Sequence, residues 1–439
     1  MKRLPMCFLA IAIAFLIAVG LSVIAYGHKE FRQEGSPLSG ASDFVIQIDD
    51  FGSFWDASVP ESALSAIERS IKSTNTIVVL FVHGWHHNAA PGDDNVIDFA
   101  DSLSKVRDLL VDNPGGVPGP YRRSRELLTT KPDVNIIGIY IGWRGKSLPM
   151  PLDYLTFWGR KAAAERVGQG DLAEFLARLH AIYLRSYARR KVSHNKPFMG
   201  MVTFGHSFGG QVLFRSVSQA LEQQFVAASS SGDRKNGLPI VGLGDLVVLV
   251  NPALEAFQFE RLHRLSRELT FDRRQTPVLL VLSAETDLAR KALFPIGRWI
   301  DSLFRAPFRE GQAQLWKTAL GEYERQQTHL VDIDAASAED AGRVAQFDPM
   351  DYVRDPCKII NYDLADAPAI AGLRFTPTKN NRPFNPLLVA YTSGDVIIRH
   401  SGIFEKTLRK FLNDYVAIVE GKRLLLSDAR RAESCPRGN

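Results

Sequence analysis

Hydrophobic residues form short unbroken runs along the chain, and these alternate with longer stretches in which apolar residues recur with a helical period. Such runs are typical of parallel strands that helices bury on both faces. The predicted strands are residues 44–48, 76–82, 134–141, 198–204, 245–250, 277–282 and 386–391. The predicted helices between them include residues 96–110, 171–189, 208–223, 253–267 and 402–419. This alternation predicts an α/β fold with a doubly wound, mostly parallel sheet.

One region departs from the alternation. About a hundred residues separate the last two predicted strands, which is far more than one crossover helix requires. We expect an insertion, at about residues 288–385, over the carboxyl edge of the sheet. Its apolar residues Ile296, Trp299, Ile300, Leu303 and Phe304 have the spacing of an amphipathic helix. The apolar face of this helix either packs on the body in the ordinary way or forms a lid or a lipid-contacting surface. Both interpretations stay open.

The N-terminus carries a targeting segment. Lys2 and Arg3 precede residues 4–26, which contain no charged residue and are long enough to cross a bilayer as a helix. Residues 1–27 are therefore predicted to be a transmembrane anchor, or a signal peptide if the segment is cleaved and the body secreted. Residues 28–42 are polar, contain Gly, Pro and Ser, and are predicted to link this segment to the body, residues 43–439.

Charge and cysteine content narrow the choice of compartment and partners. The two basic residues before the segment favour a cytoplasmic N-terminus and a body outside the cytoplasm, in the periplasm or an equivalent space. There, Cys357 and Cys435 could form one disulfide, although two unpaired thiols remain the alternative. The formal net charge is +5 with a pI of about 9.0, and there is no dense Lys/Arg tract or nucleic-acid motif. We therefore expect no nucleic-acid partner.

A candidate nucleophile follows the fourth predicted strand. Residues 198–214 are FMGMVTFGHSFGGQVLF, so an apolar run leads through Gly205-His206-Ser207-Phe208-Gly209 into a helical pattern. A serine hydroxyl must be presented clear of the sheet, and a tight strand-to-helix turn does this at the cost of a crowded backbone. Gly205 and Gly209, two residues before and after Ser207, would relieve that crowding. The sequence therefore predicts that Ser207 is a catalytic nucleophile on such a turn.

The oxyanion donors are predicted from the second strand, in TIVVLFVHGWHHNAA (residues 76–90). The strand ends at a His-Gly step, after which a backbone N–H can turn toward a reacting carbonyl. Trp85 and Phe208 would supply the two amides. His83, His86 and His87 form only a weak metal motif, so we expect no metal or other cofactor, with His83 structural and the other two at the pocket mouth.

The base is expected late in the chain and the acid before it. His400, in YTSGDVIIRHSGIF (residues 391–404), lies just ahead of the last predicted helix and is preferred to His329, which falls in the insertion. Asp287, just past the strand in PVLLVLSAETDL (residues 277–288), is the preferred acid. Glu285 is the near alternative, and Glu255 the distant one.

The motifs FVHGW (81–85), IGWRG (141–145), GHSFGG (205–210) and IRHSGIF (398–404) together resemble those of the α/β-hydrolase superfamily. The resemblance is closest to a lipase- or esterase-like branch, which also has a tryptophan after the next strand, matched here by Trp143. It covers residues 75–290 well and 386–420 fairly. It implies an α/β-hydrolase fold, Ser207 as nucleophile, His400 as base and an acid at or near Asp287. The chain departs from the branch after Pro252, where Ala253 and Leu254 stand in place of an acidic residue.

These features predict a serine hydrolase that cleaves carboxylic esters of small molecules or lipids through an acyl-enzyme. The apolar insertion and the anchor lean toward hydrophobic esters. An inactive, membrane-anchored binding or scaffold protein on the same fold is the alternative. A metal-dependent hydrolase built on the His83–His87 cluster is a third possibility, and a chelator would inactivate it.

Overall fold

The computed structural model describes residues 43–110, 134–147, 156–193, 196–230, 239–285, 311–334, 369–398 and 402–426. Single residues outside these ranges are also described, namely Ile17, Gly20, Asp153, Cys357, Asp363 and Leu364. The predicted N-terminal segment and linker therefore lie, apart from Ile17 and Gly20, outside the described residues. Within the described ranges, no helix combines the length and the apolar character needed to cross a bilayer.

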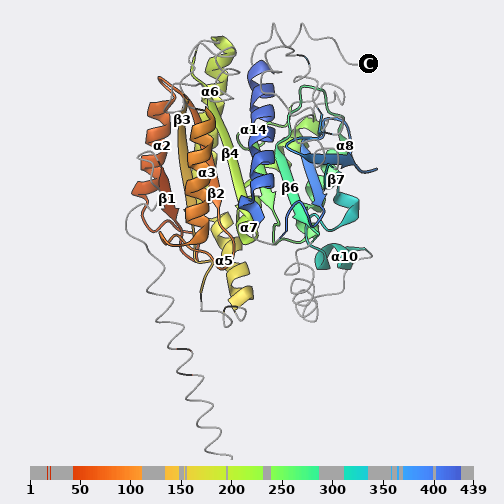
Figure 1. Ribbon diagram of the computed structural model, residues 1–439, viewed down its shortest axis with the longest axis horizontal. Coiled ribbons are helices and arrows are strands. Elements are labelled where there is room, and N and C mark those ends of the chain that lie inside the picture. The colour runs from red at the N-terminus through yellow and green to blue at the C-terminus, as the bar shows by residue number, and fades with distance from the viewer. Residues whose placement is uncertain are drawn as a thin grey trace, which may run out of the picture.

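The core of the molecule is one nine-stranded sheet in the order β1-β3-β2-β4-β5-β6-β9-β7-β8 (Figure 1). All neighbouring strands are parallel except β7 and β8, which pair antiparallel. The strands are β1 (Phe44–Gln47), β2 (Asn75–Val82), β3 (Val134–Gly142), β4 (Met199–His206), β5 (Leu246–Val250), β6 (Leu279–Ala284), β7 (His329–Ile333), β8 (Leu373–Pro377) and β9 (Leu387–Thr392). The mostly parallel α/β sheet predicted from the sequence is confirmed, and each predicted strand overlaps an observed one.

Helices cover both faces of the sheet, as uninterrupted apolar strands such as β5 (LVVLV, all buried) require. On one face pack α2 (Ser58–Ser70), α5 (Phe157–Gln169), α6 (Asp171–Val192), α7 (Phe208–Ser230) and α8 (Ala256–Glu268). On the other face, toward the viewer in Figure 1, pack α3 (Asp94–Leu110) and α14 (Lys406–Leu426). Each face has its own hydrophobic core, so the carboxyl edge of the sheet lies between two packed layers.

The described part of the insertion extends the sheet. It contributes α10 (Gln312–Lys317), a short 3-10 helix (Glu324–Gln326), and the strands β7 and β8. The strands β7 and β8 extend the sheet beyond β9, while Ala319, after α10, pairs with Glu255, which follows the carboxyl end of β5. The physical reason is that β9 is almost entirely buried and apolar, and such a strand at an open edge would invite pairing with other chains. The predicted amphipathic helix at residues 296–304 lies outside the described residues.

Candidate active site

Ser207 is the single residue between the end of β4 and the start of α7. Its φ is 55°, in the left-handed region that a side chain disfavours, as in a sharp strand-to-helix turn. The Ser207 N–H donates to Val250 O at 3.0 Å, and its carbonyl accepts from Ala253 N at 3.0 Å. Because the residue is held from both sides by the segment around the end of β5, the surrounding structure enforces the unfavourable conformation.

The glycines around Ser207 permit the close approach of α7 to β2. A Cβ placed on Gly209 would lie 2.5 Å from His83 O and closer still to Val82 O. A Cβ on Gly205 would lie 2.7 Å from Gly209 O. Any side chain at either position would therefore push the amino end of α7 away from the strand ends.

The loop after β2 comes directly against Ser207. In the register of the sheet Val82 lies opposite Gly205, so Gly84 is level with Ser207. A Cβ on Gly84 would lie 2.9 Å from both Ser207 Cβ and His206 O. The residues expected to supply the oxyanion donors are neighbours, since the rings of Trp85 and Phe208 have centroids 6.0 Å apart. Phe208 is also the first residue of α7, and the first N–H groups of a helix have no acceptor within it.

His83 fastens this loop to the loop after β3. Its Nδ1 donates to Gly84 O at 2.9 Å, while Nε2 accepts from the N–H of Trp143 at 2.9 Å. The indole Nε1 of Trp143 donates to His83 O, and the two rings stack with an angle of 6° between their planes. Burial lowers the pKa of His83 to about 4, so the imidazole is neutral at neutral pH and can accept as well as donate.

The other two histidines of the cluster have separate carboxylate partners. His86 Nδ1 bonds to Asp153, and His87 Nδ1 bonds to Asp93 at 3.0 Å. Burial acts to raise the pKa of Asp93, but the hydrogen bond and charge of His87 hold it below its usual value. The Nδ1 atoms of the three imidazoles therefore bond to three different groups. In the described part of the chain, no group of three or more His, Cys, Asp or Glu side chains is placed to hold a metal ion.

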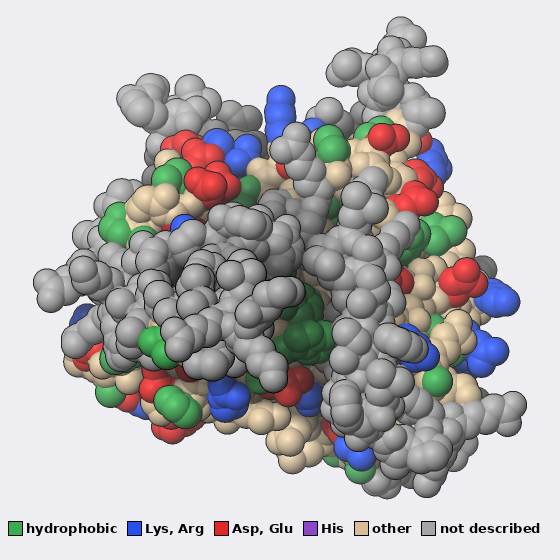
Figure 2. Space-filling model, turned by 90° about the horizontal axis from the view of Figure 1, so that it is seen from below, with side chains coloured by type: hydrophobic (Ala, Val, Ile, Leu, Met, Phe, Trp, Pro, Cys, Tyr) green, Lys and Arg blue, Asp and Glu red, His purple; other side chains and the backbone are tan. Residues whose placement is uncertain are grey.

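Aromatic side chains form a wall beside the turn. The ring of Phe157, the first residue of α5, lies 5.1 Å from that of Phe208 and 5.1 Å from that of Trp85. Seen from below, toward the carboxyl ends of the strands, the molecule shows recessed hydrophobic side chains near the middle of its surface (Figure 2). An apolar group could pack against such a wall next to Ser207.

The preferred base and acid, His400 and Asp287, lie outside the described residues. Of the alternative acids, Glu285 is exposed at the end of β6, and its N–H donates to Thr392 O at 2.9 Å. Glu255 is 1% exposed, and its carboxylate lies 3.4 Å from the ammonium of Lys161 on α5. Glu255 is thus already paired with a buried cation. Nothing in the local sequence distinguishes Lys161 from an ordinary solvated lysine, because the burial of its ammonium depends on tertiary packing.

The described segment that follows His400 packs near the carboxyl end of β2. Gly402–Phe404 form a 3-10 helix that begins two residues after His400. The ring of Phe404 lies 5.2 Å from that of Phe81, near the carboxyl end of β2 and three residues before Gly84. A Cβ on Gly402 would lie 3.2 Å from Ile397 Cγ2, so residues 397 and 402 lie close together. These contacts fix the flanks near the strand that neighbours β4.

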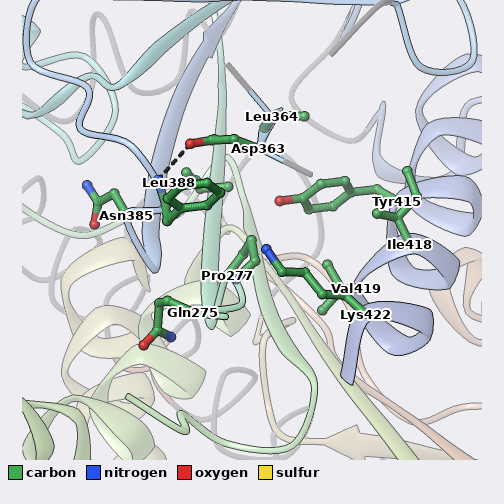
Figure 3. A pocket seen from close by; sticks show the side chains of 11 residues that line it. Gln275, Pro277, Asp363, Leu364, Asn385, Leu388, Tyr415, Ile418, Val419 and Lys422 are labelled. Carbon is green, nitrogen blue, oxygen red and sulfur yellow. Dashed lines mark hydrogen bonds between the residues drawn. The ribbon is translucent and has the colours of Figure 1, made fainter. Parts of the chain in front are cut away.

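Other hollows lie away from Ser207 in the described part of the chain. An open groove of about 1030 Å³ runs between α5, α7 and α8, and Lys161, Glu255, Trp158 and Trp316 are among its lining residues. A cavity of about 20 Å³ lies near the amino ends of β6 and β9, where the side chains of Tyr415 and Lys422 point toward Asp363 (Figure 3). This cavity has room for about one water molecule and lies at the opposite edge of the sheet from Ser207.

Comparisons of the chain with models of protein families, with curated proteins and with solved structures found no match in any of the three.

Proposed function

We propose that the chain is a serine hydrolase that cleaves carboxylic esters, with Ser207 as its nucleophile. The observation that carries the proposal is the left-handed Ser207 between a buried strand and a helix, directly against the glycine loop after β2. A serine in a functionally neutral turn has no need of this strain, which costs about 1–3 kcal/mol and is typical of functional sites. The resemblance of the four sequence motifs to α/β-hydrolases supports the same fold and chemistry.

In the proposed mechanism, His400 takes the proton from the Ser207 hydroxyl as it attacks the ester carbonyl. The carbonyl oxygen becomes an oxyanion, and the amides of Trp85 and Phe208 stabilise it. His400 then protonates the departing alcohol, and water, activated by the same imidazole, hydrolyses the acyl-enzyme. The placing of the flanking 3-10 helix against β2 supports His400 as the base.

We propose Asp287 as the acid that orients His400. It follows the carboxyl end of β6 by three positions, and the end of β6 is tied to the preceding strand, because Ala284 N donates to Asn251 Oδ1 at 2.8 Å. The pairing of Glu255 with Lys161 argues against Glu255. Asp287→Asn should lower kcat by about 10⁴-fold, as loss of the correct tautomer does in other triads, whereas Glu285→Gln should have little effect. A large loss with Glu285→Gln alone would assign the acid to Glu285.

The proposed substrate is an ester with a hydrophobic acyl or alcohol group, of a small molecule or a lipid. The aromatic wall of Trp85, Phe157 and Phe208 supports this choice. We also propose that an N-terminal helix anchors the body outside the cytoplasm. That location is supported by Cys357, which is disulfide-bonded, since such bonds persist mainly in oxidising compartments.

The proposal is tested with a fluorophosphonate, which labels activated serine nucleophiles. The wild type should be labelled and should hydrolyse p-nitrophenyl esters, Ser207→Ala should do neither, and the control Ser216→Ala, on the same helix, should retain both. Labelling that persists in Ser207→Ala would reject Ser207. A folded wild type with neither labelling nor activity would favour the inactive scaffold, and loss of activity with a chelator would favour the metal hydrolase.

A further inference from the structure

A buried ion pair lies behind the turn that holds Ser207. Lys161 is 3% exposed and Glu255 is 1% exposed, and their ammonium and carboxylate groups lie 3.4 Å apart. The pair joins α5 to the residue that precedes α8. Burying two charges has a large desolvation cost, so a buried pair is weak evidence for a role in stability, and the other hydrogen bonds of Lys161 indicate what the pair does.

The further hydrogen bonds of Lys161 lead to Ser207. The ammonium donates to Gln211 Oε1 at 3.2 Å and to Ala253 O at 3.1 Å. The amides of these same two residues donate to the carbonyl of Ser207, at 3.2 Å from Gln211 N and 3.0 Å from Ala253 N. One cation therefore holds both residues that fix the Ser207 carbonyl.

The loop that contains Ala253 is held from its other side as well. Leu320 N donates to Leu254 O at 2.8 Å, and Ala256 N donates to Thr318 O at 2.9 Å, so the segment after α10 pairs with residues 254–256. Lys161 adds a charged contact to the same loop, at Ala253 O. Without Lys161, Ala253 would be free to shift relative to α7. The hydrogen bond from Ala253 N would then no longer hold the Ser207 carbonyl in one position.

We propose that Lys161 is a positioning residue for the nucleophile, an inference that rests on the proposed function of Ser207. Its ammonium ties Gln211 on α7 and Ala253 after β5 to one point, and this keeps Ser207 in its left-handed conformation. Glu255 neutralises the buried ammonium of Lys161 and is not the acid that orients His400. The pair touches no reacting atom and acts only through the geometry of the turn.

The test compares two double variants. Lys161→Met/Glu255→Gln removes the buried pair without leaving one charge unpaired. The control Arg261→Met/Glu222→Gln removes a pair of 2.8 Å that joins α7 to α8 beside the same groove and involves neither Gln211 nor Ala253. Folding is followed by circular dichroism, and the rate constant of fluorophosphonate labelling is measured with kcat and KM for p-nitrophenyl butyrate.

We expect Lys161→Met/Glu255→Gln to lower the labelling rate constant and kcat together by about 10- to 100-fold, with KM within about twofold, because a small displacement of a nucleophile has effects of this size. The control pair should stay within about twofold of the wild type. Lys161→Arg, which keeps a cation and its donors, should recover part of the loss. A smaller folded fraction would lower the labelled amount and the apparent kcat, but it would leave the labelling rate constant of the folded molecules unchanged, so the rate constant separates the two causes.

A folded Lys161→Met/Glu255→Gln variant that is labelled at the wild-type rate would overturn the inference. If that variant does not fold, Gln211→Leu decides, because it breaks one tether without removing a charge. We expect its labelling to fall by about 3- to 10-fold, and an unchanged rate would again overturn the inference. Failure of the proposed function would look different, since the wild type itself would then resist labelling.

Discussion

At the scale of single residues, the candidate site depends on one strained serine and the glycines that let backbone approach it. The motif around Ser207 could be recognised from the sequence because the turn is local and its glycines lie within a few positions. The buried pair behind it could not, because Lys161 and the loop it holds are 92 positions apart in the chain. Burial of a lysine depends on tertiary packing that no local pattern encodes.

Gly84→Ala tests the close approach of the loop to the nucleophile. The added methyl group would lie 2.9 Å from both Ser207 Cβ and His206 O, and one of the two segments would have to move. We expect the fluorophosphonate labelling rate constant to fall by about 100-fold or more. Gly92→Ala is the matched control, because a Cβ at Gly92 meets nothing within 4 Å. Equal labelling of the two variants would show that the loop does not set the geometry of Ser207.

Lys422 illustrates a residue whose burial costs stability. It is 2% exposed, its ammonium lies 5.2 Å from the centroid of the Phe384 ring, and burial lowers its pKa to about 8 (Figure 3). Because the folded state binds this proton less tightly than the unfolded state, the free energy of unfolding should rise between about pH 8 and 10.5. Lys422→Met should raise it by about 1–3 kcal/mol at pH 7 and flatten that rise. Urea titrations at pH 7 and 10 measure both effects, and a destabilised variant would contradict this account.

At the scale of elements, the buried strands were the most predictable part of the fold. Strands such as β2 and β5 are continuous apolar runs, whereas β7 and β8 are short strands in which buried and exposed residues alternate. They were not predicted because so short an alternation within a polar stretch is a weak signal. Helix α5 was also missed, since it buries Arg160 and Lys161, and these charges hide the apolar face that helical periodicity relies on.

Helix α14 is joined through the core to the opposite layer by Arg423. Its guanidinium donates to Tyr183 Oη at 3.1 Å and to the carbonyls of Val241 and Asp245, each at 3.1 Å, while Tyr183 donates to Asp245 Oδ1 at 2.8 Å. Because both Arg423 and Asp245 are buried, removing one charge leaves the other buried without an opposite charge. The network therefore couples α14, which follows His400, to α6 on the other face of the sheet.

Arg423→Leu should lower the free energy of unfolding by about 3–5 kcal/mol, since it leaves the Asp245 carboxylate buried without its cation. The control Lys410→Leu, at an exposed position of the same helix, should change it by less than about 0.5 kcal/mol. Urea unfolding followed by circular dichroism measures both values. Similar small losses for the two variants would mean that α14 is held by its apolar face alone.

At the scale of the whole molecule, the candidate site and the other buried charged residues lie at opposite edges of the sheet. The candidate site occupies the carboxyl edge, while Arg423, Asp245 and Lys422 lie toward the amino edge, where α14 ends (Figure 1). A doubly wound, mostly parallel sheet could be predicted, because alternating buried strands and helices leave few alternatives. The extension of the sheet beyond β9 could not, since it depends on which edge strand needs cover.

Two buried histidines, His83 and His329, and the partly buried His180 should make this fold sensitive to acid. Burial lowers the pKa values of His83, His180 and His329 to about 4 from an ordinary value of 6.5. Above pH 6.5 these imidazoles are neutral in both the folded and the unfolded state, so they add no pH dependence. Below it the unfolded state binds more protons, and stability falls as the pH drops toward 4.

We expect the free energy of unfolding to decrease steadily from about pH 6.5 to 4, by up to about 3 kcal/mol for each of the fully buried His83 and His329. The carboxylates of Asp50, Asp93 and Asp153, whose pKa values lie below 3.8, would lose most of their stabilising contribution only at still lower pH. The pKa of Glu260 is lowered from 4.5, so the histidines dominate the part of the window above about pH 5. Urea titrations at pH 7.5, 6.0, 5.0 and 4.5 measure the slope. His329→Gln should reduce it by the equivalent of about one proton, whereas identical slopes would mean that His329 is as readily protonated in the folded protein as in the unfolded chain.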